Sequence, residues 1–131
     1  MAELKCIVVT PEGTVRETTA DFVALTLFDG EIGISPGHTP MIGRLGAGEL
    51  RIKLADQVDR YYIEGGFVEV VGDEVSILTT QAMPVEDIDA DITLEQLVAA
   101  RQKPANTPEL MAIRDRAVLL ARAQLRVADK L

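Results

Sequence analysis

The 131-residue sequence is poor in aromatic side chains and in positive charge. It contains no tryptophan, and aromatic residues make up only 4% of the chain. Carbohydrate-binding sites and base-stacking surfaces depend on such rings, so both kinds of site are disfavoured. The net charge is −8, which argues against nucleic acid and against an anionic membrane surface as the main partner.

Cysteine and histidine each occur once, as Cys6 and His38. A single cysteine cannot form an internal disulfide, which favours a reducing compartment, and its alternation with Leu4 and Val8 indicates a small buried side chain. His38 has neither a second histidine nor a nucleophile motif to work with. We interpret it as a structural or interface residue, and we expect no catalytic residue and no metal site.

Long apolar runs are also missing. The longest, from Phe22 to Phe28, is too short to span a bilayer. The N-terminus lacks the basic and apolar regions of a signal peptide. We therefore expect a soluble protein without direct membrane insertion.

Apolar residues alternate with polar ones along short segments of the first 80 residues. Six such segments are visible, at residues 4–8, 23–27, 50–54, 61–63, 67–71 and 75–78. Glycine, proline and aspartate turn signals separate them. Short strands at this spacing are typical of an antiparallel β-sandwich or barrel whose inward faces form the core.

After this region, the spacing of the apolar residues changes from every second residue to every third or fourth, as in a helix. Residues 84–91 hold a proline and four acids, and we interpret them as an acidic hinge that charge repulsion keeps solvated. The predicted organisation is therefore a β-sandwich domain over residues 1–83, the hinge, and a helical hairpin over residues 92–131.

Two helices are predicted in the hairpin. Thr93 is expected to cap the first, which should end by Lys103 because Pro104 disfavours helical geometry in the residue before it. Thr107 caps the second helix and Pro108 takes its first position. A hairpin of this length is marginal alone, so its apolar stripe should pack either on the sandwich or on another protein.

The end of the chain is basic although the whole chain is acidic. Residues 107–131 carry five basic side chains against three acids, a net charge of +2, which leaves −10 on the other 106 residues. Arg122, Arg126 and Lys130 are four residues apart and share one helical face, whereas Arg116 lies roughly 120° away. This stripe is either a solvated surface or a site that recognises an acidic segment.

The segment GEIGISPGHTP at residues 30–40 resembles the signature of ATP synthase epsilon subunits. GGFVEV at 65–70, VSILTTQA at 75–82 and AQLRV at 123–127 resemble other parts of the same family, in the family's order. The resemblance covers essentially the whole chain. It implies a ten-stranded antiparallel β-sandwich followed by a two-helix antiparallel hairpin.

The resemblance also implies a function and partners. Members of this family are non-catalytic rotor subunits in the central stalk of F-type ATP synthase, and they couple the catalytic head to the membrane proton channel. The implied partners are the γ subunit and the c-ring, together with the α and β subunits when the hairpin extends and inhibits ATP hydrolysis. The implied location is peripheral, on the cytoplasmic face of the bacterial plasma membrane.

Specific residues acquire roles by the same resemblance. Glu31, Ile32 and Gly33 fall in the loop that faces the c-ring, and His38 and Pro40 fall in an adjoining interface loop. A solvated surface acid remains the alternative for Glu31. The inhibitory contacts of the last helix would be made by Arg116, Arg122, Arg126 and Lys130.

The glycines at positions 30, 33 and 37 invite comparison with a phosphate-binding loop. Their spacing fits neither the dinucleotide pattern nor a lysine-terminated loop. We expect them to provide positive φ in a tight turn between strands.

Some members of the family bind ATP on the hairpin through an Ile/Leu-Asp-x-x-Arg-Ala motif and arginines of the second helix. Asp89 matches the aspartate, but Ile92 and Thr93 replace the arginine and alanine. The lost arginine removes a bidentate phosphate donor, which leaves Asp89, Arg122 and Arg126 as candidates. We expect no cofactor and no tight ATP binding, and we keep a nucleotide-sensing module as the alternative function.

Overall fold

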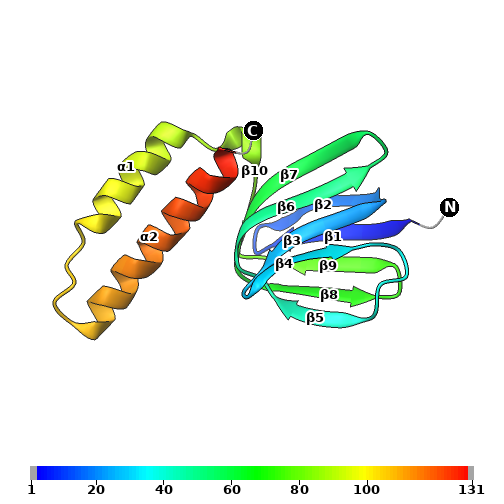
Figure 1. The fold of residues 1–131 in the computed structure, drawn as a ribbon, viewed down its shortest axis with the longest axis horizontal. Helices are drawn as coiled ribbons and strands as arrows, with labels where there is room; N and C mark the ends of the chain where they lie inside the picture. The colour runs from blue at the N-terminus through cyan, green and yellow to red at the C-terminus, as the bar shows by residue number, and fades with distance from the viewer. Residues whose placement is uncertain (1–2, 130–131) are drawn as a thin grey trace. The chain divides into compact units, whose positions relative to one another are not determined.

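The computed structural model of the chain describes residues 3–129 (Figure 1). They form two compact units that divide between Pro84 and Val85. The first unit is a sandwich of ten strands in two five-stranded sheets, and the second is a pair of α-helices preceded by a 3₁₀ turn. The ten-stranded β-sandwich and the helical hairpin predicted from the sequence are confirmed.

Each sheet is named here after one of its inner strands. The β1 sheet contains, in spatial order, β2 (Gly13–Ala20), β1 (Leu4–Thr10), β9 (Glu74–Leu78), β8 (Phe67–Val71) and β5 (Met41–Arg44). The β6 sheet contains, in spatial order, β10 (Gln81–Pro84), β7 (Gln57–Glu64), β6 (Ala47–Leu54), β3 (Phe22–Leu27) and β4 (Gly30–Ile34). Neighbouring strands are antiparallel except β1 and β9, which run parallel.

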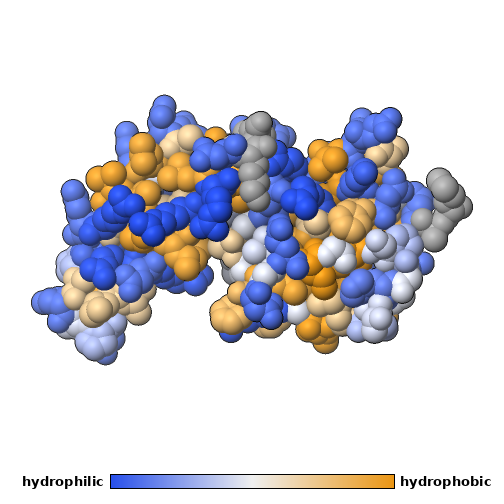
Figure 2. Space-filling model, viewed as in Figure 1, coloured by the Kyte–Doolittle hydropathy of each residue, from blue (hydrophilic) through white to orange (hydrophobic). Residues whose placement is uncertain are grey.

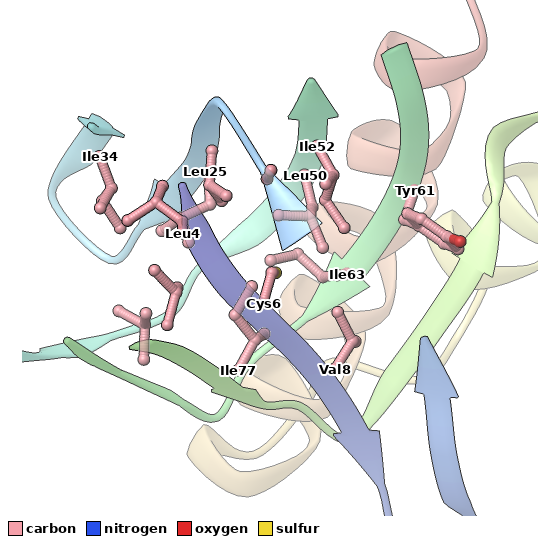
Figure 3. Packing of buried hydrophobic residues seen from close by; sticks show 14 of the residues in the cluster. Leu4, Cys6, Val8, Leu25, Ile34, Leu50, Ile52, Tyr61, Ile63 and Ile77 are labelled. Atoms are coloured by element: carbon pink, nitrogen blue, oxygen red, sulfur yellow. The ribbon is translucent and has the colours of Figure 1, made fainter. Parts of the chain in front are cut away.

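The inner faces of the two sheets pack together as one apolar core (Figure 3). Cys6 and Ile77 of the β1 sheet and Leu50 and Ile63 of the β6 sheet are completely buried there. Burying one aliphatic side chain of this size stabilises a fold by roughly 1.5–3 kcal/mol. Burial raises the pKa of the Cys6 thiol to about 12, so the thiol stays protonated and Cys6 is the small core residue that its spacing predicts.

Four strands show no clear alternation in the sequence, and all four lie at the edges of the sheets. They are β2 and β5 in the β1 sheet and β10 and β4 in the β6 sheet. β2 is almost wholly exposed, so no apolar period marks it. Pro84 ends β10 opposite Tyr61, and an edge position tolerates its missing N–H.

At one corner of the sandwich, the β3–β4 turn lies against the β5–β6 connection. The backbone N–H of Phe28 donates to the carbonyl of Arg44 at 2.8 Å, and Gly46 donates to Thr26 at 3.1 Å. Leu27 and Leu45 form a β-bridge between them. These contacts hold the β3–β4 turn against the end of β5.

The first helix begins one turn earlier than predicted. It spans α1 (Ala90–Arg101) after the 3₁₀ turn η1 (Val85–Asp87), and Asp89 rather than Thr93 is its N-cap. Asp89 has extended backbone angles, and its carboxylate accepts from the N–H groups of Asp91 and Ile92. Aspartate is a better cap than threonine, and the Thr93 hydroxyl donates to the Asp89 carbonyl inside the helix.

The second helix begins as predicted. In α2 (Pro108–Ala128), Thr107 is the N-cap and accepts from the Leu110 N–H at 3.1 Å, and Pro108 takes the first turn. The two helices pack side by side within their unit (Figure 1). The Thr93 hydroxyl also lies 3.3 Å from the side-chain amide oxygen of Gln124, which adds a polar contact between them.

Glycine is essential at Gly66, between β7 and β8. Its φ is +100°, and a Cβ there would lie 1.9 Å from the carbonyl oxygen of Leu78. We expect Gly66→Ala to destabilise the sandwich by about 3 kcal/mol or more, because a strained backbone and a backbone clash add. Gly72→Ala is the matched control, since Gly72 has φ +57° and open space around it, and should lose only about 1–2 kcal/mol. Urea unfolding followed by circular dichroism measures the free energy of unfolding of both variants. Equal losses in the two would contradict a clash at Gly66.

Candidate functional site

The three residues predicted to face the c-ring lie in a strand and not in a loop. Glu31, Ile32 and Gly33 belong to β4, where they pair with Thr26, Leu25 and Ala24 of β3. The turn itself is limited to residues 28–29. The prediction that these residues form a loop is therefore wrong. Gly30, with φ +145°, is already the first residue of β4 and not part of the turn.

Only one of these three residues offers a side chain to a partner. Ile32 is partly buried and packs against the core. Gly33 lies beneath Phe22, because a Cβ there would come within 2.6 Å of the ring. Its backbone does not have positive φ, unlike glycines 30 and 37, so the prediction of positive φ fails at this position. Glu31 remains, with a side chain that is 57% exposed.

Glu31 lies beside a group of charges on the outer face of the β6 sheet, which we call the Glu49 cluster (Glu31, Glu49, Arg51 and Arg60). Arg51 Nη1 lies 2.7 Å from Glu49 Oε1 and 3.9 Å from Glu31 Oε1. Arg60 donates to Glu49 through Nε at 2.9 Å and also through Nη2. Glu31 is thus the exposed end of a charge network whose centre is buried.

The electrostatics of the cluster depend on Glu49. Its side chain is only 2% exposed, while Arg51 and Arg60 are directly opposite each other in the strand register. Burial raises the pKa of Glu49, but hydrogen bonds from Arg51 and Arg60 and their two charges outweigh burial and hold the pKa below its ordinary 4.5. Like charges opposite each other destabilise a sheet, and the Glu49 carboxylate offsets that repulsion.

His38 and Pro40 lie in the loop that follows β4. The His38 N–H donates to the Ser35 carbonyl at 3.1 Å, and its Nδ1 lies 2.7 Å from the Thr39 carbonyl. Gly37 has φ +84° and donates to the Asp73 carboxylate at 3.0 Å. The loop is thus fixed by its own backbone and tied to the β8–β9 turn.

The structure brings together only two of the predicted cations of the last helix, Arg122 and Arg126. Arg122 and Arg126 are exposed and line a shallow hollow on α2 together with Asp115, Val118 and Leu119. Arg116 is exposed but is not part of the hollow, and Lys130 lies outside the described residues. Asp89, the other nucleotide candidate, does not line it, and its carboxylate is engaged as the α1 cap.

A second surface was not predicted from the sequence. Four large apolar side chains stand exposed on the outer face of the β1 sheet, and we call them the β1-sheet patch: Ile42 at 73%, Phe67 at 55%, Val71 at 56% and Leu78 at 51%. Phe67 pairs directly with Leu78 across β8 and β9. The available signal is that FVEVV in β8 has apolar residues on both faces of the strand.

A cation adjoins this patch at the sheet corner. Arg44 pairs with Phe67 across β5 and β8, and its guanidinium carbon lies 5.1 Å from the centre of the Phe28 ring. Phe28 is 72% exposed. The patch therefore ends in an arginine stacked on an aromatic ring, a cation–π contact.

Neither a candidate metal site nor a membrane-spanning helix is present in the described part of the chain. Residues 3–129 contain no group of three or more His, Cys, Asp or Glu side chains placed to hold a metal ion. Neither described helix is long and apolar enough to cross a membrane.

Comparison with known proteins gives a consistent match. Residues 3–85 match the family model for the ATP synthase, Delta/Epsilon chain, beta-sandwich domain. The chain is 47% identical over 125 residues to the ATP synthase epsilon chain of Rhodopirellula baltica, an alignment that covers 95% of this chain and 98% of that one. It is 38% identical over 120 residues to the ATP synthase epsilon chain of Desulfitobacterium hafniense strain Y51, covering 92% and 90%.

Two solved structures share the fold. One is from the Euglena gracilis mitochondrial ATP synthase, an assembly of OSCP, F1 and c-ring, with a TM-score of 0.79, 24% identity, and coverage of 98% of this chain and 79% of that one. The other is from the central stalk and c-ring of the Tetrahymena thermophila mitochondrial ATP synthase, with a TM-score of 0.69, 15% identity, and coverage of 97% and 94%. At these identities the likeness concerns the fold.

The Glu49 cluster generates a stability prediction. Glu49→Gln should lower the free energy of unfolding at pH 7 by about 2 kcal/mol, because hydrogen bonds from charged groups are lost and two arginines are left facing each other. Since the folded pKa of Glu49 lies below its ordinary 4.5, wild type has this stabilisation above about pH 4.5 and loses it as the pH falls through the folded value. Urea unfolding between pH 7 and 3 should show the gap narrowing below pH 4.5.

The exposed acid Glu12 provides the control for this prediction. Glu12→Gln should have nearly the same free energy of unfolding as wild type, because the side chain of Glu12 lies in an exposed turn. A Glu49→Gln deficit that stays constant from pH 7 to pH 3 would contradict the assignment of the stabilisation to the Glu49 charge.

Proposed function

The chain belongs to the ATP synthase epsilon chain family, and on that premise we propose that it couples the catalytic head of an F-type ATP synthase to the membrane proton channel. It acts as a non-catalytic subunit of the central stalk, between the γ shaft and the c-ring. We place it peripherally at the cytoplasmic face of the bacterial plasma membrane. The names of its relatives and the central-stalk assemblies of its structural neighbours support this role.

The observation that carries the proposal is the β1-sheet patch. A chain with a net charge of −8 exposes four large apolar side chains on one sheet face, and such patches mark protein interfaces. Figure 2 shows apolar side chains at the surface of the sandwich among polar ones. We assign this face to the γ subunit, since torque transfer needs a rigid surface and a sandwich face provides one.

The ring contact is assigned to the edge of the other sheet. Glu31 projects from edge strand β4, and among residues 3–129 its carboxylate has only the 3.9 Å contact with Arg51, a weak pairing for an exposed carboxylate. It therefore stays available for charge-assisted hydrogen bonds to a partner. The loop of His38 and Pro40 follows the same strand and supports the interface.

The hairpin is assigned to regulation. Several of its large apolar residues are exposed, at 57% for Ile113 and for Leu119 and 52% for Leu94, so they are available to a partner. Arg122 and Arg126 add a basic face to α2. We infer that an extended hairpin lies along γ, with this face against an acidic segment of the catalytic β subunit, and thereby inhibits ATP hydrolysis.

The docking surface is tested by a charge placed in the patch. Ile42→Asp should weaken binding to an immobilised α3β3γ complex from the same organism by about 30-fold or more, because a buried charge at an apolar interface costs at least ~2 kcal/mol. Val58→Asp is the matched control, since Val58 is 47% exposed but lies on β7 of the other sheet. Equal effects of the two substitutions on the dissociation constant would reject this face.

The regulatory role is tested by truncation after Pro84, where the two units divide. A chain of residues 1–84 keeps β10 and the whole core, so it should bind α3β3γ with unchanged affinity and raise the ATPase rate several-fold relative to the complex with full-length protein. In the full-length chain, Arg122→Gln with Arg126→Gln should raise it partly, and Arg101→Gln on α1 should not. An ATPase rate that truncation leaves unchanged would exclude inhibition by the hairpin.

A further inference from the structure

The sandwich contains four arginines, and one of them differs from the rest. Arg16, Arg51 and Arg60 each contact a carboxylate, Arg16 at 2.9 Å and Arg51 at 2.7 Å. Arg44 forms no ion pair within residues 3–129, although Glu69 pairs with Ile42, two residues before it in the same strand. In so acidic a chain, an arginine without a carboxylate partner calls for a physical reason.

Arg44 is nevertheless held in place. Its backbone carbonyl accepts from the Phe28 N–H at 2.8 Å, and its guanidinium stacks on the Phe28 ring at 5.1 Å. In the strand register, Phe67 of β8 is its cross-strand partner. The charge therefore lies over the exposed Phe28 ring at the end of the β1-sheet patch.

From this geometry we propose that Arg44 binds a carboxylate of the γ subunit when the β1-sheet patch docks. The inference rests on the proposed docking function and adds to it the residue that selects the partner. Arg44 is the charged specificity residue of the interface, and Phe28 is the positioning residue that orients it.

The guanidinium group of arginine is planar, and its N–H donors lie in that plane. A ring that covers one face of the group leaves the N–H donors at its edge pointing outward, where they match the two oxygens of a carboxylate. Docking of the surrounding apolar side chains removes water from the group. A guanidinium left unpaired at that point would oppose binding, so the partner must supply an acceptor, and a charged one gives the strongest hydrogen bonds.

The position also fits the anatomy of an interface. Arginine and aromatic residues are the side chains most often found at binding hot spots, and apolar neighbours that exclude water surround them. Arg44, Phe28 and Phe67 reproduce this arrangement with the patch as the apolar surround. The excess of acidic residues over basic ones in the rest of the sandwich would repel an acidic partner elsewhere on it, so Arg44 also fixes the register of docking.

The test measures binding of full-length variants to immobilised α3β3γ over a range of NaCl concentrations. Arg44→Gln should weaken binding about 10- to 100-fold at low salt, as expected for the loss of hydrogen bonds between charged groups, and it should reduce the salt dependence. Arg44→Lys should restore the salt dependence but only part of the affinity, because lysine lacks the planar fork. Phe28→Leu should weaken binding less, and non-additively with Arg44→Gln.

Controls separate the possible failures. Lys53→Gln removes an exposed cation from the outer face of the other sheet and should change nothing. Normal binding by Arg44→Gln, while Ile42→Asp fails to bind, overturns this inference and leaves the docking face standing. Normal binding by Ile42→Asp overturns the docking face itself.

Two other outcomes count against the inference. If Arg44→Gln loses affinity but keeps the wild-type salt dependence, the acceptor is neutral, and the proposal that Arg44 binds a carboxylate is overturned. Sedimentation of the free chain as a dimer that Ile42→Asp dissociates would show that a second copy occupies the patch. Thermal unfolding of each variant at the wild-type temperature confirms that binding, and not folding, has changed.

Discussion

The packing of the two inner sheet faces is the contact on which the rest of the sandwich depends. Each central strand turns every second side chain inward, and most of those side chains are buried. The period of two then leaves the alternate positions on the outer faces, where they carry little of the stability. For this reason the β1-sheet patch and the Glu49 cluster can lie on opposite faces of one rigid body without weakening its core.

The sequence revealed the strands that contribute most to that core. Six alternating segments correspond to β1, β3, β6, β7, β8 and β9, which are the inner strands of the two sheets. The four that alternation missed are the edge strands, which have one neighbour and often no covered face. The exposed side chains of Gly13–Ala20 follow no apolar period, so only the family resemblance predicted them. Likewise Asp89 displaced Thr93 as a cap because two good capping residues one turn apart compete, and propensity ranks them only weakly.

The sequence predicted only those features of the site that do not depend on how the strands pair. Glu31 is exposed, as its resemblance to the family suggested, but its environment depends on register. Glu49, Arg51 and Arg60 come together because β6 and β7 pair so that the two arginines are opposite. No spacing along the chain encodes that contact. Phe28 and Arg44 are likewise 16 residues apart in number and adjoin only because the corner hydrogen bond brings the turn to β5.

The hairpin follows a different physical logic from the sandwich. Its helices have 12 and 21 residues. Most helical stability in proteins comes from the packing of an apolar face, so the stability of the hairpin depends on what covers its apolar side chains. Reversing an equilibrium from 1:99 to 99:1 takes roughly 5.5 kcal/mol of differential binding. At about 25 cal/mol per Å² that equals roughly 220 Å² of apolar surface, or two to four side chains. Leu94, Ile113 and Leu119 are each at least half exposed, so in the proposed regulation the burial of these three side chains against a partner would suffice for such a reversal. A loss of the same size from the sandwich core would be comparable to the whole stability of a small domain.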